Sequence, residues 1–353
     1  MCALAVKEMV RKQKKIQRRA IGILASAVFL LLVVAVLAIG IGSVYIPPER
    51  VLAVLWRPAD ILNTDSIIVH NMRLTRILGS MVGGAALALA GLLMQILFGN
   101  PIADPYILGI SSGARMVVGF VLLGGITLQL PFTDSPWFLF WGAFLGALLV
   151  MSLMLVFANR FHNITLVLIA GMMVGYFCSA VVNTLVAFSD DNRIADFTRW
   201  NLGSFGLLSW QKLKVLAFIC LLMFLVAMLL SKNLNLLVMG EDYAQTMGVH
   251  TKQLRLWIIA VSGVLTAVVT AFCGLISFVG MSVPHITRLL LKTTDNRILI
   301  PGVLLLGAMF GVVCDLIART IAAPGELPVG IITSFVGVPL VLYLLCRQQG
   351  GRW

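Results

Sequence analysis

The chain has 353 residues, of which 60% are hydrophobic and only 11% are charged, and its formal net charge is +12. An ordinary soluble domain is about 45–50% apolar and about 25% charged. So few polar side chains cannot cover a water-facing surface. The composition therefore argues against a soluble enzyme, a disordered chain and a fibre, and it favours a membrane protein.

Nine stretches of at least 17 residues contain no Asp, Glu, Lys or Arg. In chain order they are 20–48, 77–103, 116–133, 135–159, 161–189, 215–231, 256–287, 298–314 and 327–346. A helix of about 20 apolar residues crosses the ~30 Å hydrocarbon core of a bilayer. Because Lys and Arg precede the first stretch, it resembles a signal peptide, but its length and the lack of a cleavage site indicate a retained helix.

The longest stretch, 256–287, is interrupted by Gly274, Gly280 and Pro284. We expect one full helix, a non-helical break, and a short helix from about Pro284 to Leu291, because irregular backbone inside a membrane needs shielding by protein or water. The count then becomes ten. The predicted fold is an all-α polytopic membrane protein with about ten transmembrane helices, some of them broken.

Positively charged residues mark cytoplasmic loops. Seven Lys and Arg precede residue 20, and with ten spans both termini lie inside. Sixteen Lys and Arg then fall on the inner side and nine on the outer side. We predict a basic cytoplasmic segment at 1–20, a permease domain at 21–347 with an inner loop at about 231–255, and a cytoplasmic tail at 348–353. The basic segment favours contact with anionic lipid over nucleic acid, since no soluble domain follows it.

The sequence offers no chemistry of its own. It has no phosphate-binding loop, no HExxH or GxSxG motif, and no metal spacing among its six cysteines, so no metal or cofactor site is expected in this chain. An intramembrane enzyme is therefore disfavoured. Active transport would draw its energy from an ion gradient or from another subunit.

A weak internal repeat is visible in two segments, 91–101 and 274–284, which share a Gly-Leu start and a Pro ten residues later. We expect each to close a long helix and open a short one, the first at the inner face and the second at the outer face. That arrangement is typical of an inverted-topology repeat around a central pathway.

Small residues also recur at a spacing of four, at Gly79/Gly83, Gly142/Gly146 and Gly171/Gly175. Such spacing lets helices approach closely, either within the subunit or between subunits.

Several ordered motifs together resemble one family. They are Arg73 with Arg76, the glycine- and alanine-rich run 83–91, Gln95, Asn100-Pro-Ile-Ala-Asp-Pro105, 108–114, Gly240-Glu241 with Gly248, 278–285, Arg288, Asp315 with Arg319, and Glu326-Leu-Pro-Val-Gly330. From about residue 73 to the C-terminus the chain resembles the FecCD family, the membrane-spanning permeases of bacterial ABC importers for iron-siderophores, haem and cobalamin.

The resemblance implies a place in the bacterial cell membrane and a set of partners. They are a second permease subunit, identical or a paralogue, two cytoplasmic ATPase subunits that carry ATP and Mg²⁺, and an extracytoplasmic binding protein that delivers the metal-chelate cargo. It also implies that Arg73, Arg76 and Arg319 receive carboxylates of the binding protein. The alternatives from the residues themselves are contacts with lipid headgroups, helix capping, or an i,i+4 pair of Asp315 with Arg319.

The inner loop carries a second set of residues with a role in the family. Glu241 and Asp242 suit a helix start, Gly248 suits a helix stop, and Thr251 suits the cap of the next helix, so we expect two short helices meeting at Gly248. In the family this knob couples the permease to the ATPase, and the matching residues are Gly240, Glu241, Ala244 and Gly248. Without the family, a solvated linker is the simpler interpretation.

The remaining predictions concern the pathway and the subunit contact. The pathway candidates are Gln95, Asn100, Pro101, Arg115, Ile164 and Thr165, and the dimer candidates are Gly171 and Gly175. Arg115 departs from the family pattern, and because a charge inside a span is costly we hypothesise that it attracts an anionic cargo. Structural hydrogen bonding for Gln95 and an internal pair for Arg115 are the alternatives. A secondary transporter driven by an ion gradient remains the rival, and the cargo is not specified.

Overall fold

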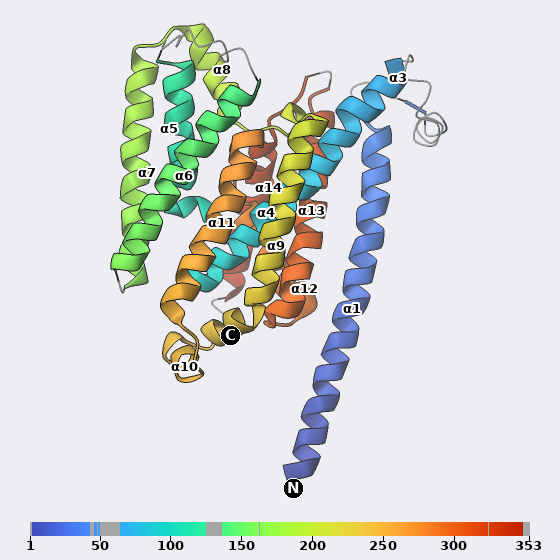
Figure 1. The fold of residues 1–353 in the computed structure, drawn as a ribbon. Helices are drawn as coiled ribbons and strands as arrows, with labels where there is room; N and C mark the ends of the chain where they lie inside the picture. Colours follow the sequence, from blue (N-terminus) through green and yellow to red (C-terminus); the bar gives the residue numbers. More distant parts are fainter. Residues whose placement is uncertain are drawn as a thin grey trace.

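The computed structural model describes residues 2–42, 46–47, 49, 64–124, 136–161, 163–323 and 325–348. Predictions that fall on 125–135 and on most of the tail, 349–353, lie outside the described residues. The described part is helical, without a strand (Figure 1).

Helices of very different length follow one another along the chain. They are α1 (Cys2–Gly40), α3 (Thr64–Ile67), the π-helix η1 (Ile68–Leu74), α4 (Thr75–Phe98), η2 (Pro105–Leu108), α5 (Ile110–Leu122), α6 (Pro136–Arg160), α7 (Ile164–Ala187), α8 (Asp191–Asn201), η3 (Phe205–Leu207), α9 (Trp210–Val238), α10 (Glu241–Thr246), α11 (Thr251–Cys273), α12 (Val279–Leu291), α13 (Asn296–Thr320) and α14 (Val329–Gln348).

Seven helical segments of the described chain are long and apolar enough to cross a membrane. They lie in α1, in η1 with α4, and in α6, α7, α9, α11 and α13. The other three predicted spans correspond to α5, α12 and α14, which are shorter or give a shorter apolar segment. The span predicted at 116–133 begins earlier, at Ile110, and its described helix ends at Leu122.

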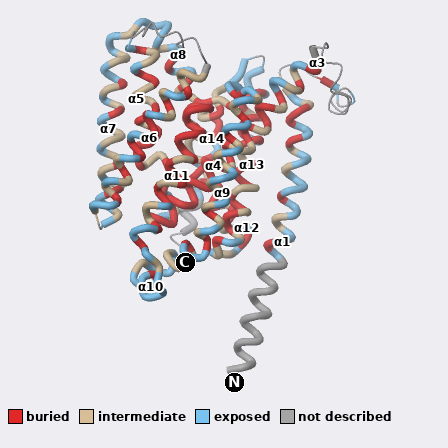
Figure 2. Tube along the Cα trace, viewed as in Figure 1, coloured by how far each residue is buried: buried red, intermediate tan, exposed pale blue. Residues whose placement is uncertain are grey.

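Helices α4, α11 and α13 form the centre. Most residues of their apolar windows are buried, whereas few residues of the windows in α1, α7 and α9 are buried (Figure 2). Close approach depends on small residues: a Cβ added at Gly84 would lie 2.3 Å from Gly307 O, and one at Gly91 would lie 1.9 Å from Gly280 O. Gly79 and Gly83 likewise face Leu208 and Phe205 of the same chain. The small-residue spacing therefore serves packing inside the subunit.

Helix α4 ends toward α10 and α11 ends toward α8, at the opposite ends predicted for the two breaks (Figure 1). The two broken segments also contact each other in the interior. After α4 the chain turns back through η2, whose Tyr106 hydroxyl accepts a hydrogen bond of 3.2 Å from Ile276 N in the second break. A Cβ on Gly280 would lie 2.6 Å from Pro105 Cδ. Gly91 lies inside α4 while Gly274 follows α11, so the two glycines aligned in the predicted repeat are not equivalent.

The helix after the second break is longer than predicted. It starts at Val279, and Pro284 lies inside it. The predicted knob, both described chain ends and the lower ends of α6 and α7 gather at one end of the molecule, while α3 and α8 lie at the other (Figure 1).

Candidate functional site

The three arginines predicted for docking come together at the α3 end of the molecule. Arg73 lies in the π-helix that precedes α4, Arg76 lies in the first turn of α4, and Arg319 lies in the last turn of α13. We call Arg73, Arg76 and Arg319, with Asp315 and Glu326, the arginine cluster. Two of its members, Arg76 and Glu326, are 250 residues apart in sequence.

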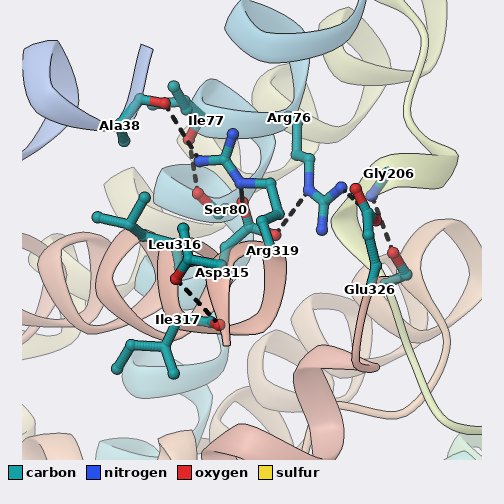
Figure 3. Close-up of polar contacts among 12 residues, drawn as sticks. Ala38, Arg76, Ile77, Ser80, Gly206, Asp315, Leu316, Ile317, Arg319 and Glu326 are labelled. Carbon is teal, nitrogen blue, oxygen red and sulfur yellow. Dashed lines mark hydrogen bonds and ion pairs between the residues drawn. The ribbon is translucent and has the colours of Figure 1, made fainter. Parts of the chain in front are cut away.

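Arg76 is the centre of this cluster (Figure 3). Its Nε donates to Asp315 Oδ1 at 2.8 Å, and its Nη1 donates to Glu326 Oε2 at 2.7 Å. Asp315 is fully buried, and its Oδ2 lies 3.1 Å from Arg319 Nε without hydrogen-bond alignment. The predicted i,i+4 pair of Asp315 with Arg319 is therefore present, and one buried carboxylate balances two guanidinium groups.

Arg73 and Arg319 also hold the end of α1. Arg73 Nη1 donates to Ile39 O at 2.7 Å and to Gly40 O at 3.1 Å, and Arg319 Nη2 donates to Ala38 O at 3.3 Å. The last carbonyls of a helix lack internal partners and carry partial negative charge, so cations there are stabilising. Helix capping, one of the alternatives in the sequence, is thus observed for two of the three arginines.

The arginine cluster lines a cavity of about 570 Å³. All three arginines and Glu326 contribute to its wall, together with the loop around Ser204 and Gly206. The arginines are less than a tenth exposed, so they are recessed side chains. Burial follows from the contacts with α1 and α13, which no local pattern reveals.

The knob at the opposite end is one short helix, α10, and not two. Helix α9 continues to Val238, and α11 begins at Thr251. Gly240 (φ 120°) and Gly248 (φ 85°) bound α10, both with positive φ. Gly248 N donates to Gln245 O at 2.9 Å and Val249 N to Ala244 O at 3.0 Å, the Schellman stop that a glycine favours.

Side chains fix the knob to α11. Glu241 pairs with Arg255, and Gln245 Nε2 donates to Thr251 Oγ1 at 3.1 Å. Thr251 is therefore the first residue of α11 and a partner of α10, whereas the cap position that we predicted for it belongs to His250.

Ala244 is completely buried, so it cannot itself touch another subunit. The exposed apolar side chains of the knob, which were not predicted, are Met239, Tyr243 and Met247. The sequence could have indicated this apolar surface, because Tyr243 and Met247 are large apolar residues one helical turn apart in an otherwise polar segment.

Gln95 is an internal bridge between α4 and α12. Pro284 has no N–H for the carbonyl of Gly280, and Gln95 Nε2 donates to Gly280 O at 3.3 Å and to Met281 O at 3.2 Å. Gln95 Oε1 accepts from Arg288 Nη1. Gln95 is 3% exposed, so the structural alternative for this predicted pathway residue is observed.

Four of the other pathway candidates lie at two helix ends. Asn100 Oδ1 accepts from Ile102 N at 3.0 Å in the exposed turn after α4, next to the partly buried Pro101. Ile164 and Thr165 begin α7, where Thr165 N donates to Asn163 Oδ1 at 2.9 Å.

Arg115 lies on the second turn of α5, half-buried, and among the described residues its buried Nε has no hydrogen-bond partner. An internal ion pair, the alternative for this residue, is not seen in the part of the chain that the structure describes.

Gly171 and Gly175 pack inside the subunit. A Cβ on Gly171 would lie 2.9 Å from Leu108 Cα, and one on Gly109 would lie 2.7 Å from Gly171 O. The opposite face of α7 carries exposed Met173, Tyr176 and Phe177. A subunit contact predicted for α7 would therefore use that face and not the two glycines.

Within the described residues no group of three or more His, Cys, Asp or Glu side chains could hold a metal ion. The predicted site residues thus fall mainly in the arginine cluster, the knob and the interior bridge around Gln95.

Comparison with known proteins gives a consistent result. The sequence profile of the FecCD transport family matches residues 30–347. The haemin transport system permease HmuU of Yersinia pestis is 35% identical over 332 residues, covering 92% of this chain and 96% of the relative. The vitamin B12 import system permease BtuC of Klebsiella pneumoniae is 35% identical over 342 residues, covering 95% and 96%.

Among solved structures, an inward-facing conformation of a metal-chelate type ABC transporter matches with a TM-score of 0.81 and 29% identity. The match covers 92% of this chain and 99% of the other. The arrangement of helices is thus shared along nearly the whole of both chains.

Proposed function

Because the chain belongs to the FecCD transport family, a family of bacterial membrane permeases, we propose that it is the transmembrane subunit of an ABC importer for a metal-chelate cargo. In this role it carries out no covalent chemistry. It receives cargo from an extracytoplasmic binding protein, and two separate ATPase subunits with ATP and Mg²⁺ drive it.

The observation that carries the proposal is that the arginine cluster and the knob lie at opposite ends of the molecule. The arginine cluster lies at the α3 end, and the knob α10 lies at the other end with both described chain ends (Figure 1). We assign the knob end to the cytoplasm because sixteen Lys and Arg, seven of them in the N-terminal segment, fall on that side and nine on the other. A docking surface outside and a coupling surface inside are what a permease between two partners requires.

The coupling role rests on the shape of the knob. Gly240 and Gly248 supply backbone conformations that other residues rarely adopt, and the Glu241–Arg255 pair holds the short helix against α11. Exposed Tyr243 and Met247 then offer an apolar contact to an ATPase subunit. Work done by that subunit would reach α9 and α11, which flank the knob.

The second permease subunit, identical or a paralogue, would cover exposed faces of α7 and α14. Exposed Tyr176, Phe177 and Phe335 are large apolar side chains on these faces. A cavity of about 590 Å³ adjoins Phe335 and is lined by the first turns of α14, the end of α8 and the α11–α12 break. Pairing of two such faces would enclose a pathway between the subunits.

The names of the relatives support haem or cobalamin as cargo, and iron-siderophores belong to the same chemical class. Arg115, with a buried unpartnered Nε among the described residues, supports an anionic group on the cargo. The rest of the apolar surface faces membrane lipid, and the proposal involves no nucleic acid.

The rival is a secondary transporter, which would need titratable groups free to cycle at mid-membrane. Asp315 is held by two arginines, and Asp104 caps η2 by accepting from Tyr106 N at 2.9 Å. Both carboxylates thus have structural roles, which favours the ATP-driven importer.

The test is reconstitution in vesicles, with the chain alone and with the ATPase and binding protein that co-purify with it. We expect ATP-dependent uptake of cargo by the complex and none by the chain alone. Uptake by the isolated chain that follows a proton or sodium gradient would instead establish the secondary transporter.

A further inference from the structure

The two carboxylates on Arg76 differ in depth. Asp315 is buried within α13, whereas the side chain of Glu326 is 46% exposed on the connection between α13 and α14. These two partners occupy Nε and Nη1 of Arg76. In the described part of the chain the buried Nη2 has no hydrogen-bond partner. Arg76 therefore has a buried partner in Asp315, a half-exposed partner in Glu326, and one donor group, Nη2, without a partner among the described residues.

Arg76, which carries the unpartnered Nη2, contributes to the wall of the 570 Å³ cavity together with Glu326. A guanidinium binds a carboxylate best through two parallel N–H···O bonds, yet Glu326 takes one, from Nη1. A carboxylate that entered from the cavity could take Nη1 and Nη2 together. Three arginines against two carboxylates leave the cluster with a positive charge, which attracts such an anion.

We propose that Glu326 is an intramolecular placeholder: it occupies Arg76 at rest, and a carboxylate side chain of the docking protein displaces it. This inference rests on the proposed function, which supplies the docking protein. The occupant is a protein carboxylate and not the cargo, because the cavity lies among η1, η3 and the end of α13, away from the exposed faces of α7 and α14. Arg73 and Arg319 contribute charge while they remain on the carbonyls of α1.

Displacement of Glu326 from Arg76 would also affect the contacts at the start of α14. The segment 325–328, which carries Glu326, is followed by Val329, whose N–H donates to Gly203 O at 3.1 Å. Leu327 N donates to Ala318 O at 3.0 Å, and a Cβ on Gly330 would lie 2.5 Å from Leu202 O and 2.9 Å from Leu275 O. The segment is thus fitted against the loop after α8 and the α11–α12 break. Release of Glu326 loosens these contacts where the 590 Å³ cavity begins.

The first test measures the reactivity of Arg76 in the full chain in lipid nanodiscs. Phenylglyoxal modifies accessible arginines, and mass spectrometry reports each site. We expect Glu326→Gln to raise the modification rate of Arg76 about two- to fivefold, the range for loss of a half-exposed ion pair. Glutarate, a small dicarboxylate probe, should lower the raised rate again, relative to chloride at equal ionic strength. Asp190→Asn, which breaks an exposed pair with Arg193, is the matched control and should leave Arg76 unchanged.

The second test uses the unaltered chain, so it does not depend on how the variant folds. Hydrogen exchange of the amides of Leu327 and Val329 should become faster when glutarate is added and should not respond to chloride. An unchanged Arg76 rate in Glu326→Gln, a rate that glutarate does not lower, or exchange that ignores glutarate would each overturn the placeholder. Neither test needs the ATPase or the binding protein. Failure of ATP-driven uptake would therefore sink the proposed function and leave this inference about Arg76 standing on its own result.

Discussion

The buried carboxylate of Asp315 allows the sharpest stability prediction. Its side chain is 1% exposed, and those of Arg76 and Arg319 are 9% and 4% exposed. Asp315→Asn keeps the shape and one acceptor oxygen but leaves two buried cations with the half-exposed Glu326 as their remaining carboxylate among the described residues. Breaking a buried ion pair by removing one partner costs about 3–5 kcal/mol, because the other charge stays buried.

We expect Asp315→Asn to lose about 3 kcal/mol, the lower end of that range, since the amide oxygen can still accept from Arg76 Nε. Glu326→Gln acts on the same guanidinium, but its side chain is 46% exposed, so screening by water limits the loss to about 1 kcal/mol or less. Comparison of the two variants therefore separates the effect of burial from the effect of removing a carboxylate. Both remove one negative charge from Arg76.

The assay is the fraction of protein that stays monodisperse in detergent after heating, compared across the two variants and the unaltered chain. Asp315→Asn should lose its monodisperse fraction at a temperature several degrees lower than the unaltered chain does. Glu326→Gln should lose it at nearly the same temperature as the unaltered chain. Equal losses for the two variants would refute the reasoning, because they would mean that Asp315 is as well solvated as Glu326.

Single contacts elsewhere in the chain lead to four more predictions. Gly91→Ala should prevent accumulation of folded protein, measured by size exclusion, because its Cβ would lie 1.9 Å from the backbone oxygen of Gly280. Gln95→Leu should lower thermal stability by about 2–4 kcal/mol, since two carbonyls and a guanidinium lose their partner. Gly248→Ala should leave the fold intact but weaken stimulation of the ATPase, because a positive φ of 85° costs a Cβ about 1 kcal/mol in the knob. Arg115→Ala should slow uptake of anionic cargo, measured in vesicles, and not that of neutral cargo.

Each of these variants has a matched control. Gly22→Ala adds a Cβ on α1 that would have no described neighbour within 4 Å, so it should be neutral or slightly stabilising. An equal loss there would contradict the packing argument for α4. Gln95→Glu keeps the acceptor for Arg288, so its stability should lie between that of Gln95→Leu and that of the unaltered chain. Asparagine adopts a positive φ more readily than alanine, so Gly248→Asn should stimulate the ATPase nearly as well as the unaltered chain does. Arg115→Lys keeps the charge, and uptake unchanged by Arg115→Ala would end the role in cargo attraction.

Local sequence signals predicted the ends of several elements correctly. Gly248 stops α10, Asn100 satisfies the turn after α4, and the first turn of α10 carries Glu241 and Asp242. These features depend on neighbours within a few residues, where backbone conformation and side-chain hydrogen bonding decide the outcome. The predicted start of α12 at Pro284 is too late. Gln95, 185 residues before Gly280, donates to the Gly280 carbonyl that the proline leaves free, and the helix runs through the proline.

By itself, the sequence determined the class of protein, its family and the approximate number of helices. Long charge-free stretches can be read directly, because each must satisfy its own backbone in lipid. The tertiary structure alone decided which faces are buried. Lipid and protein interiors are equally apolar, so the pattern of α4 does not distinguish a face against Gly280 from one against lipid. The tertiary structure also decided that Arg76 lies between Asp315 and Glu326, since such pairs form only when α4, α13 and the connection to α14 have packed together.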